Sequence, residues 1–327
     1  MVNRAMRIAA VMLVRDEADV LAVNLAHHRA LGIDDFWIID NGSSDSTPEI
    51  LRKAAADHPA IRWQRDDGPF SQSEMTSGLA RDAHRAGAGW VVAIDADEFW
   101  VTDGRRLHEI LDAAGPGVGA LAVDVVNYVQ GRWVTEAWSG SLLTMTRRAP
   151  AVVGTSGEAQ WLVEHRHAGY VETAYPPKLV SRTSADMTIT SGNHGVEGVD
   201  GIVAPTDGIA CLHAPLRARD RIVTKGAHAH RMPDDAFPAG DGWQPRRWRA
   251  LPTDGIDAEW RANSYDDVDL DVFGFPHPLV VDTRLRDAVL PHVSWTTRVR
   301  ASVDFRRHER TRRQGLRREQ RTHDGGR

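Results

Sequence analysis

Apolar and polar positions follow two alternating periods over the first 125 residues of the chain. Residues 8–14 are an unbroken apolar run, which is typical of a strand covered on both faces in a parallel sheet. Residues 16–31 then place apolar side chains at helical spacing, and Gly32 is a stop signal for that helix. A strand followed by a turn and a helix is the pattern of a βαβ unit.

The same alternation repeats along this part of the chain. Further strands are expected at residues 36–39, 61–63, 90–94 and 120–126, and further helices after Ser46 or Thr47 and at residues 73–86 and 107–114. This spacing predicts an α/β fold with a doubly wound, mostly parallel sheet flanked by helices. Ligands bind such sheets outside the carboxyl ends of the strands, which is where Arg15, Asp40 and Asp95 to Asp97 fall.

The pattern becomes irregular beyond residue 126. Residues 127–182 are strand-like, residues 186–206 have the composition of a loop or hairpin, and residues 216–229 have a helical pattern. Residues 232–277 are rich in Pro, Gly, Asp and Trp, which is typical of a lid or a loosely ordered excursion.

Charge is unevenly distributed along the chain. The formal net charge of −5 argues against a body built to coat nucleic acid or anionic lipid. Residues 298–327 contain eleven Arg and four acidic residues, so this tail carries +7 and leaves −12 for the rest of the chain. We favour a solvated tail, and a basic helix on an anionic membrane surface stays open as the alternative.

The cysteine count and the lengths of the apolar stretches indicate in which cellular compartment the protein is expected. Cys211 is the single cysteine, which excludes an intrachain disulfide and a thiolate metal cluster built from one chain. The sequence contains no apolar stretch long enough to span a bilayer. We therefore expect a cytoplasmic protein in a reducing compartment, with attachment to the inner face of the membrane as the open alternative.

Two carboxylates, Asp95 and Asp97, follow the predicted strand at residues 90–94. Carboxylate oxygens are the ligands that Mg²⁺ and Mn²⁺ prefer, and two of them near a strand end can serve one such cation. Asp40 ends another parallel strand and is expected at the same crevice. A solvated turn explains the Asp-x-Asp string equally well, and a turn with a helix cap explains residues 40–44.

Several strings occur in an order that resembles one family. They are Val14-Arg15-Asp16-Glu17, His27-His28 with Leu31-Gly32-Ile33, Ile39-Asp40-Asn41-Gly42-Ser43-Ser44-Asp45-Ser46-Thr47, and Asp95-Ala96-Asp97-Glu98-Phe99 after Trp90. The chain resembles the glycosyltransferase family 2 clan, and most closely its family 92-like branch. The similarity covers residues 7–100 and continues more sparsely at residues 178–180, 193–194 and 212–217 and at Lys225.

The resemblance implies a GT-A fold, a nucleotide-sugar donor and a divalent cation, Mn²⁺ or Mg²⁺. It implies that Asp97 is a direct metal ligand, that Asp95 faces the donor ribose or the metal-bound diphosphate, and that His213 completes the metal site or contacts the diphosphate. The other implied donor-binding residues are Arg15, Glu17, Asp40, Asn41, Gln72, Arg81, Arg217 and Lys225. Two positions depart from the family pattern, since Asp16 replaces the usual Asn and Ala214 follows His213 where an aromatic residue is common.

The activity implied is a metal-dependent, inverting glycosyl transfer to a glycan, a lipid-linked acceptor or another hydroxyl acceptor, such as a cell-envelope polysaccharide. Residues 1–230 would form the glycosyltransferase domain, with a nucleotide-sugar half at 1–126 and an acceptor and metal-completing half at 127–230. Residues 231–297 would be a lid or acceptor-side extension, and residues 298–327 a basic helical tail. Glu158 and Glu164 are candidates for the general base but are better explained as surface residues.

Other functions stay open from the sequence. A nucleotidyltransferase acting on sugar phosphates uses a similar sheet, but residues 14–17 lack the Gly-rich phosphate loop expected after its first strand. A phosphatase would place its Asp-x-Asp motif after the first strand rather than the fourth. A non-catalytic protein that binds carbohydrate or a membrane surface is the alternative from another class. A zinc site at His165, His167, His228 and His230 is disfavoured, because no His-Glu-x-x-His string is present. No nucleic-acid partner is expected.

Overall fold

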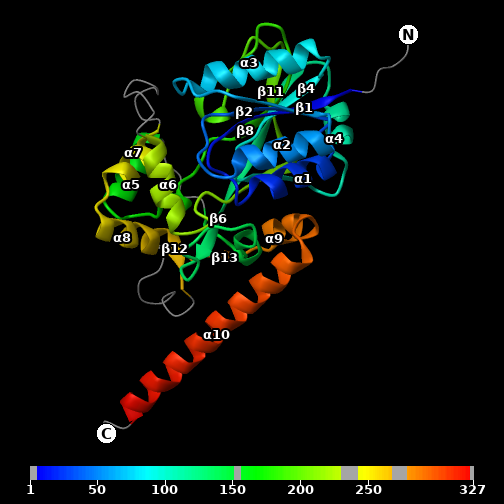
Figure 1. The fold of residues 1–327 in the computed structure, drawn as a ribbon. Helices are drawn as coiled ribbons and strands as arrows, with labels where there is room; N and C mark the ends of the chain where they lie inside the picture. Colours follow the sequence, from blue (N-terminus) through cyan, green and yellow to red (C-terminus); the bar gives the residue numbers. More distant parts are fainter. Residues whose placement is uncertain (1–5, 151–155, 230–241, 267–277, 325–327) are drawn as a thin grey trace.

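A central sheet organises the chain (Figure 1). The computed structural model describes residues 6–150, 156–229, 242–266 and 278–324, with side chains of the last helix described as far as residue 311. The strands of the sheet are β1 (Ile8–Val14), β2 (Asp35–Asp40), β3 (Ile61–Arg65), β4 (Trp90–Ala93), β5 (Glu98–Thr102), β6 (Val118–Gly131), β7 (Arg147–Arg148), β8 (Lys178–Arg182), β11 (Ile202–His213), β12 (Ser264–Tyr265) and β13 (Val280–Val281).

Strand direction confirms the expected fold class. Neighbouring strands follow the order β13-β7-β6-β8-β4-β1-β2-β3, and β1 is parallel to both β2 and β4. β8 runs antiparallel between β4 and β6, so β6 has the same direction as β4. β11 pairs parallel with β6 and antiparallel with β5. The result is a mostly parallel α/β sheet whose carboxyl ends share one edge.

Helices cover both faces of this sheet. They are α1 (Leu21–Leu31), α2 (Thr47–Asp57), α3 (Gln72–Arg85), α4 (Leu107–Ala113), α5 (Ser156–Glu164), α6 (Asp220–His228), α7 (Trp243–Ala250), α8 (Thr253–Asn263), α9 (Arg284–Val289) and α10 (Trp295–Asp324). Figure 1 shows α3 on one face and α1 with α2 on the other.

The apolar run of β1 is explained by these two layers. Ala10 and Met12 belong to the core that includes Leu21 of α1, whereas Val11 belongs to the core that includes Leu79 of α3. Successive side chains of a strand point to opposite faces, so a strand covered on both faces must be apolar at every position.

The second half of the chain contains more helix than its sequence pattern predicted. Within residues 127–182 the structure has α5, where Ala159 and Val163 are buried at a spacing of four residues, and the short helical turns η1 (Ser141–Thr144) and η2 (Tyr170–Glu172). Residues 186–206 contain the expected hairpin, β9 (Thr188–Ile189) with β10 (Val196–Glu197), followed by the start of β11.

The segment predicted as a lid is partly helical. α7 and α8 bury Trp243, Trp248 and Trp260 in a second apolar cluster with Ile222 of α6. Residues 232–241 and 267–277 of that segment lie outside the described residues. The short remaining elements are η3 (Ser191–Asn193) and η5 (Leu290–His292).

The basic tail forms the long helix α10, which extends away from the rest of the protein (Figure 1). Its first turns pack on the loop after β6, with Arg300 above the ring of Trp138 at 4.2 Å and His308 stacked on Trp133 at 5.1 Å. Within the described residues, no helix combines the length and apolar character needed to cross a membrane.

A buried histidine on α1 makes stability dependent on pH. His28 has no exposed surface, its Nδ1 lies 3.0 Å from the Asn24 carbonyl, and its Nε2 accepts from the backbone N–H of Trp100 at 3.2 Å. Desolvation lowers the pKa of His28 well below its usual value. Below about pH 6.5 the unfolded chain therefore binds a proton that the folded chain does not, so acidification favours unfolding.

We predict that His28→Gln reduces this dependence, because Gln can make both hydrogen bonds without titrating. Between about pH 6 and pH 5 the free energy of unfolding of the native chain should fall more steeply than that of the variant, by about 1.4 kcal/mol per pH unit. Urea unfolding across this range measures the two slopes. Equal slopes would show that His28 does not resist protonation.

Candidate active site

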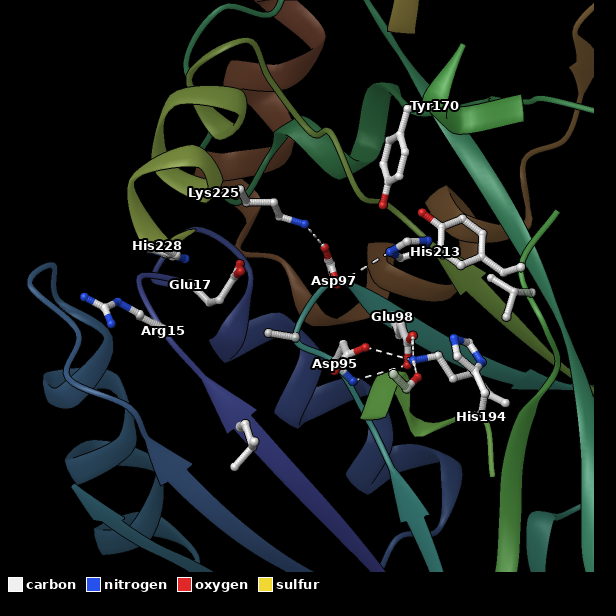
Figure 2. Close-up of a pocket in the computed structure, with 16 residues that line it drawn as sticks. Arg15, Glu17, Asp95, Asp97, Glu98, Tyr170, His194, His213, Lys225 and His228 are labelled. Carbon is white, nitrogen blue, oxygen red and sulfur yellow. Dashed lines mark hydrogen bonds and ion pairs between the residues drawn. The ribbon is translucent and has the colours of Figure 1, made fainter. Parts of the chain in front are cut away.

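A polar cleft of about 310 Å³ opens at the carboxyl ends of the central strands. Figure 2 shows side chains from β1, the turn between β4 and β5, β8, β11 and α6 converging on it. Six predicted site residues line the cleft: Arg15, Glu17, Asp95, Asp97, His213 and Lys225. The structure therefore brings together residues that lie up to 210 positions apart in the chain.

Asp97 is surrounded by positive charge. Its Oδ2 lies 2.6 Å from Nζ of Lys225 and 3.6 Å from Nη1 of Arg217, and its Oδ1 lies 3.8 Å from Nε2 of His213. Burial opposes ionisation of this carboxyl, but the neighbouring cations, Lys225 foremost, outweigh burial and hold the pKa of Asp97 well below its usual value. Asp97 is thus an anion at neutral pH.

His213 presents a lone pair to Asp97. Nδ2 of Asn127 donates to the Thr173 carbonyl at 3.1 Å, which directs Oδ1 of Asn127 toward Nδ1 of His213 at 2.9 Å. Nδ1 must therefore carry the proton, and Nε2 faces Asp97 as an acceptor. Burial lowers the pKa of His213 to about 4, so the ring is neutral near pH 7.

Two acceptors that face each other at 3.8 Å suit a cation held between them. In metal sites, too, a ligating histidine usually donates its other ring N–H to a neighbouring group, which fixes its tautomer and orientation. Within the described part of the chain no group of three or more His, Cys, Asp or Glu side chains is arranged to hold a metal ion. Asp97 and His213 could supply two protein ligands to a divalent cation, which would leave its remaining positions to water and substrate oxygens.

Asp95 is paired with Lys178, not with the cations around Asp97. Nζ of Lys178 lies 2.9 Å from Oδ2 of Asp95 and 2.8 Å from Oε1 of Glu98, and Asn193 donates to Oδ1 of Asp95 at 3.2 Å. Burial disfavours the charge of Lys178, but the two carboxyl groups outweigh it and raise the pKa of Lys178. Burial raises the pKa of Glu98 to about 8. Near pH 7 the positive charge of Lys178 therefore lies between the ionised carboxylate of Asp95 and the protonated carboxyl of Glu98.

Lys178 and Glu98 were not predicted as site residues. The Asp95-Ala96-Asp97-Glu98-Phe99 string contains a signal for Glu98, but the sequence pattern did not predict that the strand β5 begins at this residue. Lys178 belongs to a segment of sparse family resemblance. Only its pairing in β8, beside β4, brings it to the cleft.

Arg217 occupies a different place from the one predicted. It was expected to neutralise donor phosphate, but its side chain has no exposed surface and does not line the cleft. It lies 2.6 Å from Glu17 and 2.7 Å from Asp19, which in turn contact Arg221 at 2.9 Å and 3.7 Å. Arg217 is therefore buried beside Asp97, 3.6 Å from its Oδ2, and does not face the cleft.

The ends of β1 and β2 are joined by Asp16. Its φ of 50° is in the left-handed region, and its Oδ1 accepts from the backbone N–H of Ser44 at 2.6 Å and of Asp45 at 3.2 Å. Oδ2 lies 2.9 Å from Nε2 of His228, which lines the cleft. This turn delays the start of α1 to Leu21, five residues after the predicted start.

Besides Arg217, four other predicted donor-binding residues lie outside the cleft lining. Asp40 is fully buried and accepts from the backbone N–H of Ser43 at 3.1 Å, and Asn41 donates to the Asp66 carbonyl at 3.1 Å. These contacts match the alternative of a turn before a helix. Gln72 accepts from the backbone N–H of Gly192 at 2.9 Å, and Arg81 donates to the Met187 carbonyl at 3.0 Å, so both residues secure the segment around β9.

The histidines considered for zinc do not form a site within the described residues. His165 and His167 stack on Trp161 at 4.4 Å and 5.2 Å, whereas His228 lies in the cleft and His230 falls outside the described residues. Glu158 and Glu164 are exposed on α5, as expected for surface residues.

Comparisons with known proteins give remote similarities. No family model matches the chain, and no curated protein matches it. Among solved structures, S. aureus TarS 1-349 is 13% identical, with 78% of this chain and 70% of that chain covered and a TM-score of 0.36.

Two other solved structures are also remotely similar to the chain. The mannosyltransferase PcManGT from Pyrobaculum calidifontis is 16% identical over 92% of this chain and 85% of its own, with a TM-score of 0.37. Glucosyl-3-phosphoglycerate synthase from Mycobacterium tuberculosis is 16% identical over 37% and 44%, with a TM-score of 0.27. These similarities assign no family to the chain.

Proposed function

We propose that the protein is a GT-A type glycosyltransferase that takes a nucleotide-sugar donor and a divalent cation, Mn²⁺ or Mg²⁺. The observation that carries the proposal is the pair formed by ionised Asp97 and the neutral Nε2 of His213, which face each other at 3.8 Å at the carboxyl ends of the sheet. That edge is where α/β sheets bind their ligands.

Asp97 and His213 would hold the cation, which when bound supplies positive charge that stabilises the leaving diphosphate. Lys225 adds a second positive charge beside Asp97, on the side of α6. A nucleoside diphosphate leaving group accumulates negative charge as the bond to the sugar breaks, and fixed cations favour that change. Arg15 and Glu17, at the end of β1, are proposed to line the nucleotide side.

Aromatic side chains suggest where the sugar lies. Tyr170 and Tyr175 line the cleft next to His213, and the ring of Tyr175 meets that of His213 edge-on at 5.3 Å. Aromatic faces stack well on the apolar faces of sugar rings. We propose that the acceptor is a glycan, a lipid-linked sugar or another hydroxyl compound, and that transfer inverts the anomeric carbon. We also propose that the chain is divided into functional parts at residues 1–230, 231–297 and 298–327.

Thermal unfolding with a panel of nucleotides tests the proposal. UDP-, GDP-, TDP- and CMP-sugars are each added with Mn²⁺, with Mg²⁺ and with chelator. One nucleotide class is expected to stabilise the chain only when metal is present, by about 2.7 kcal/mol at a concentration one hundred times its Kd.

Two other outcomes would redirect the assignment. Stabilisation by nucleoside triphosphates but not by nucleotide sugars would favour a nucleotidyltransferase. No response to any nucleotide, with or without metal, would contradict the proposal and favour a non-catalytic binding protein.

A further inference from the structure

The outer side of helix α10 carries an apolar stripe. Trp295, Val299 and Val303 are 74%, 39% and 42% exposed, and their spacing of four residues places them on one side of the helix. Large apolar side chains in a row on an exposed helix mark an interaction surface more often than isolated ones do.

Positive charge continues this stripe. Arg306, Arg307 and Arg310 are exposed in the next turns and lie on the same half of the helix. The opposite side faces the protein, where Ala301 is buried and His308 stacks on Trp133. Asp304 also lies on the inner half, 3.7 Å from Arg300.

A groove runs beside the base of the helix. Its volume is about 380 Å³, and Leu143, Leu290 and Phe305 form its apolar part while Arg286 and Arg298 line it with positive charge. A groove of this composition suits an amphiphile that has an apolar chain and an anionic head.

We propose that α10 docks the protein onto an anionic lipid surface, with Trp295, Val299 and Val303 in the interface and the arginines on the headgroups. Charge also sets the orientation, because residues 298–327 carry +7 while the rest of the chain carries −12 and is repelled by the same surface. The combination of an apolar patch with a basic patch provides the two signals that surface attachment needs. Nucleic acid would contact the arginines but would leave the exposed Val299 and Val303 without a partner surface, so it fits α10 less well than a lipid surface does.

Vesicle flotation with the full chain tests this proposal. Vesicles of pure phosphatidylcholine are compared with vesicles that contain phosphatidylglycerol, at 0.1 M and 1 M salt. Binding is expected only to the anionic vesicles and is expected to weaken at high salt, where the Debye length falls to about 3 Å. The triple variant Arg306→Gln, Arg307→Gln and Arg310→Gln should lower the partition coefficient about a hundredfold, since each cation near the surface contributes about fivefold.

A matched triple variant controls for the loss of charge. Arg52 on α2, Arg85 on α3 and Arg106 just before α4 have side chains that are 64%, 68% and 84% exposed, and replacing each with Gln should leave vesicle binding unchanged. The double variant Trp295→Ser and Val299→Ser should lower binding at least about tenfold. Replacing the exposed Val203 and Val281 with Ser provides its control.

Four outcomes would overturn the proposal. They are equal binding to neutral and anionic vesicles, equal loss in the control triple variant, tighter binding to duplex DNA that is insensitive to Trp295→Ser, and a dimer of the free chain that the α10 variants convert to monomer. None of these readouts requires sugar transfer, so the test is independent of the proposed function.

Discussion

Replacing Asp97 with Asn is expected to lower the rate of sugar transfer about a thousandfold or more. Asn has nearly the same shape but no negative charge, so it loses the attraction for a cation that a carboxylate provides. A thousandfold corresponds to about 4 kcal/mol, which is the scale of charge stabilisation expected from a bound divalent cation. Release of nucleoside diphosphate from the donor found in the thermal screen measures the rate.

The variant should still fold, because Arg217 keeps its contacts with Glu17 and Asp19. Asp112→Asn, an exposed carboxyl on α4, is the matched control and should transfer sugar at the native rate. If Asp97→Asn retained native activity and native metal dependence, the assignment of Asp97 as the cation-holding residue would be refuted.

Replacing Arg217 with Met is expected to destabilise the fold by about 3–5 kcal/mol. Met retains much of the volume, but the largely buried carboxyl groups of Glu17, Asp19 and Asp97 lose a shared counter-ion. Arg221 and Lys225 remain, but three carboxyl groups then share two cations instead of three, and the loss of one partner from a buried ion network has a cost of this size. Urea unfolding at pH 7 measures the loss.

The cost should shrink in acid. Burial opposes ionisation of Asp19, but Arg217 outweighs it and lowers the pKa of this carboxyl in the native chain. A carboxyl whose pKa is lowered in the folded chain stabilises the fold at pH values above its unfolded pKa and loses that contribution as the pH falls. The difference in free energy of unfolding between the native chain and the variant should therefore narrow below about pH 4. Arg219→Met is the control. Arg219 lies two positions after Arg217 and pairs with Asp257, which is largely exposed, so this substitution should lower the free energy of unfolding by no more than about 1 kcal/mol. Equal losses in the two variants would contradict the network.

The N-terminal elements were predictable because each is determined locally. The apolar run of β1 and the stop at Gly32 are visible without knowledge of the partners, and β2, β3 and β4 follow the same rule. β5 was missed because the chain reverses after Asp97 and the new strand is stabilised by pairing with β11, more than a hundred residues away. α7 and α8 were missed because Pro and Gly dominate the composition around them, while three Trp side chains supply the packing.

In the candidate site, too, some residues could be predicted from local sequence and others depend on distant contacts. Asp97 and His213 could be anticipated from motifs, and the structure places them face to face. The burial of Arg217 could not be anticipated, because it depends on Glu17 and Asp19 converging from the opposite end of the chain. Asp40 shows the reverse problem, since its place at the end of a strand suggested ligand contact whereas its oxygens are already used by Ser43 and Arg65.

The position of β8 has a consequence for biosynthesis. β1 to β4 leave the ribosome first, and β4 then has no partner on one side until residues 178–182 emerge to pair with it. An unpaired strand edge is a template for pairing with other chains, so the growing polypeptide is most prone to aggregation during this interval. Any shortened chain that stops before β8 keeps that edge exposed. The strand that brings Lys178 to the cleft is therefore also the strand that protects the sheet.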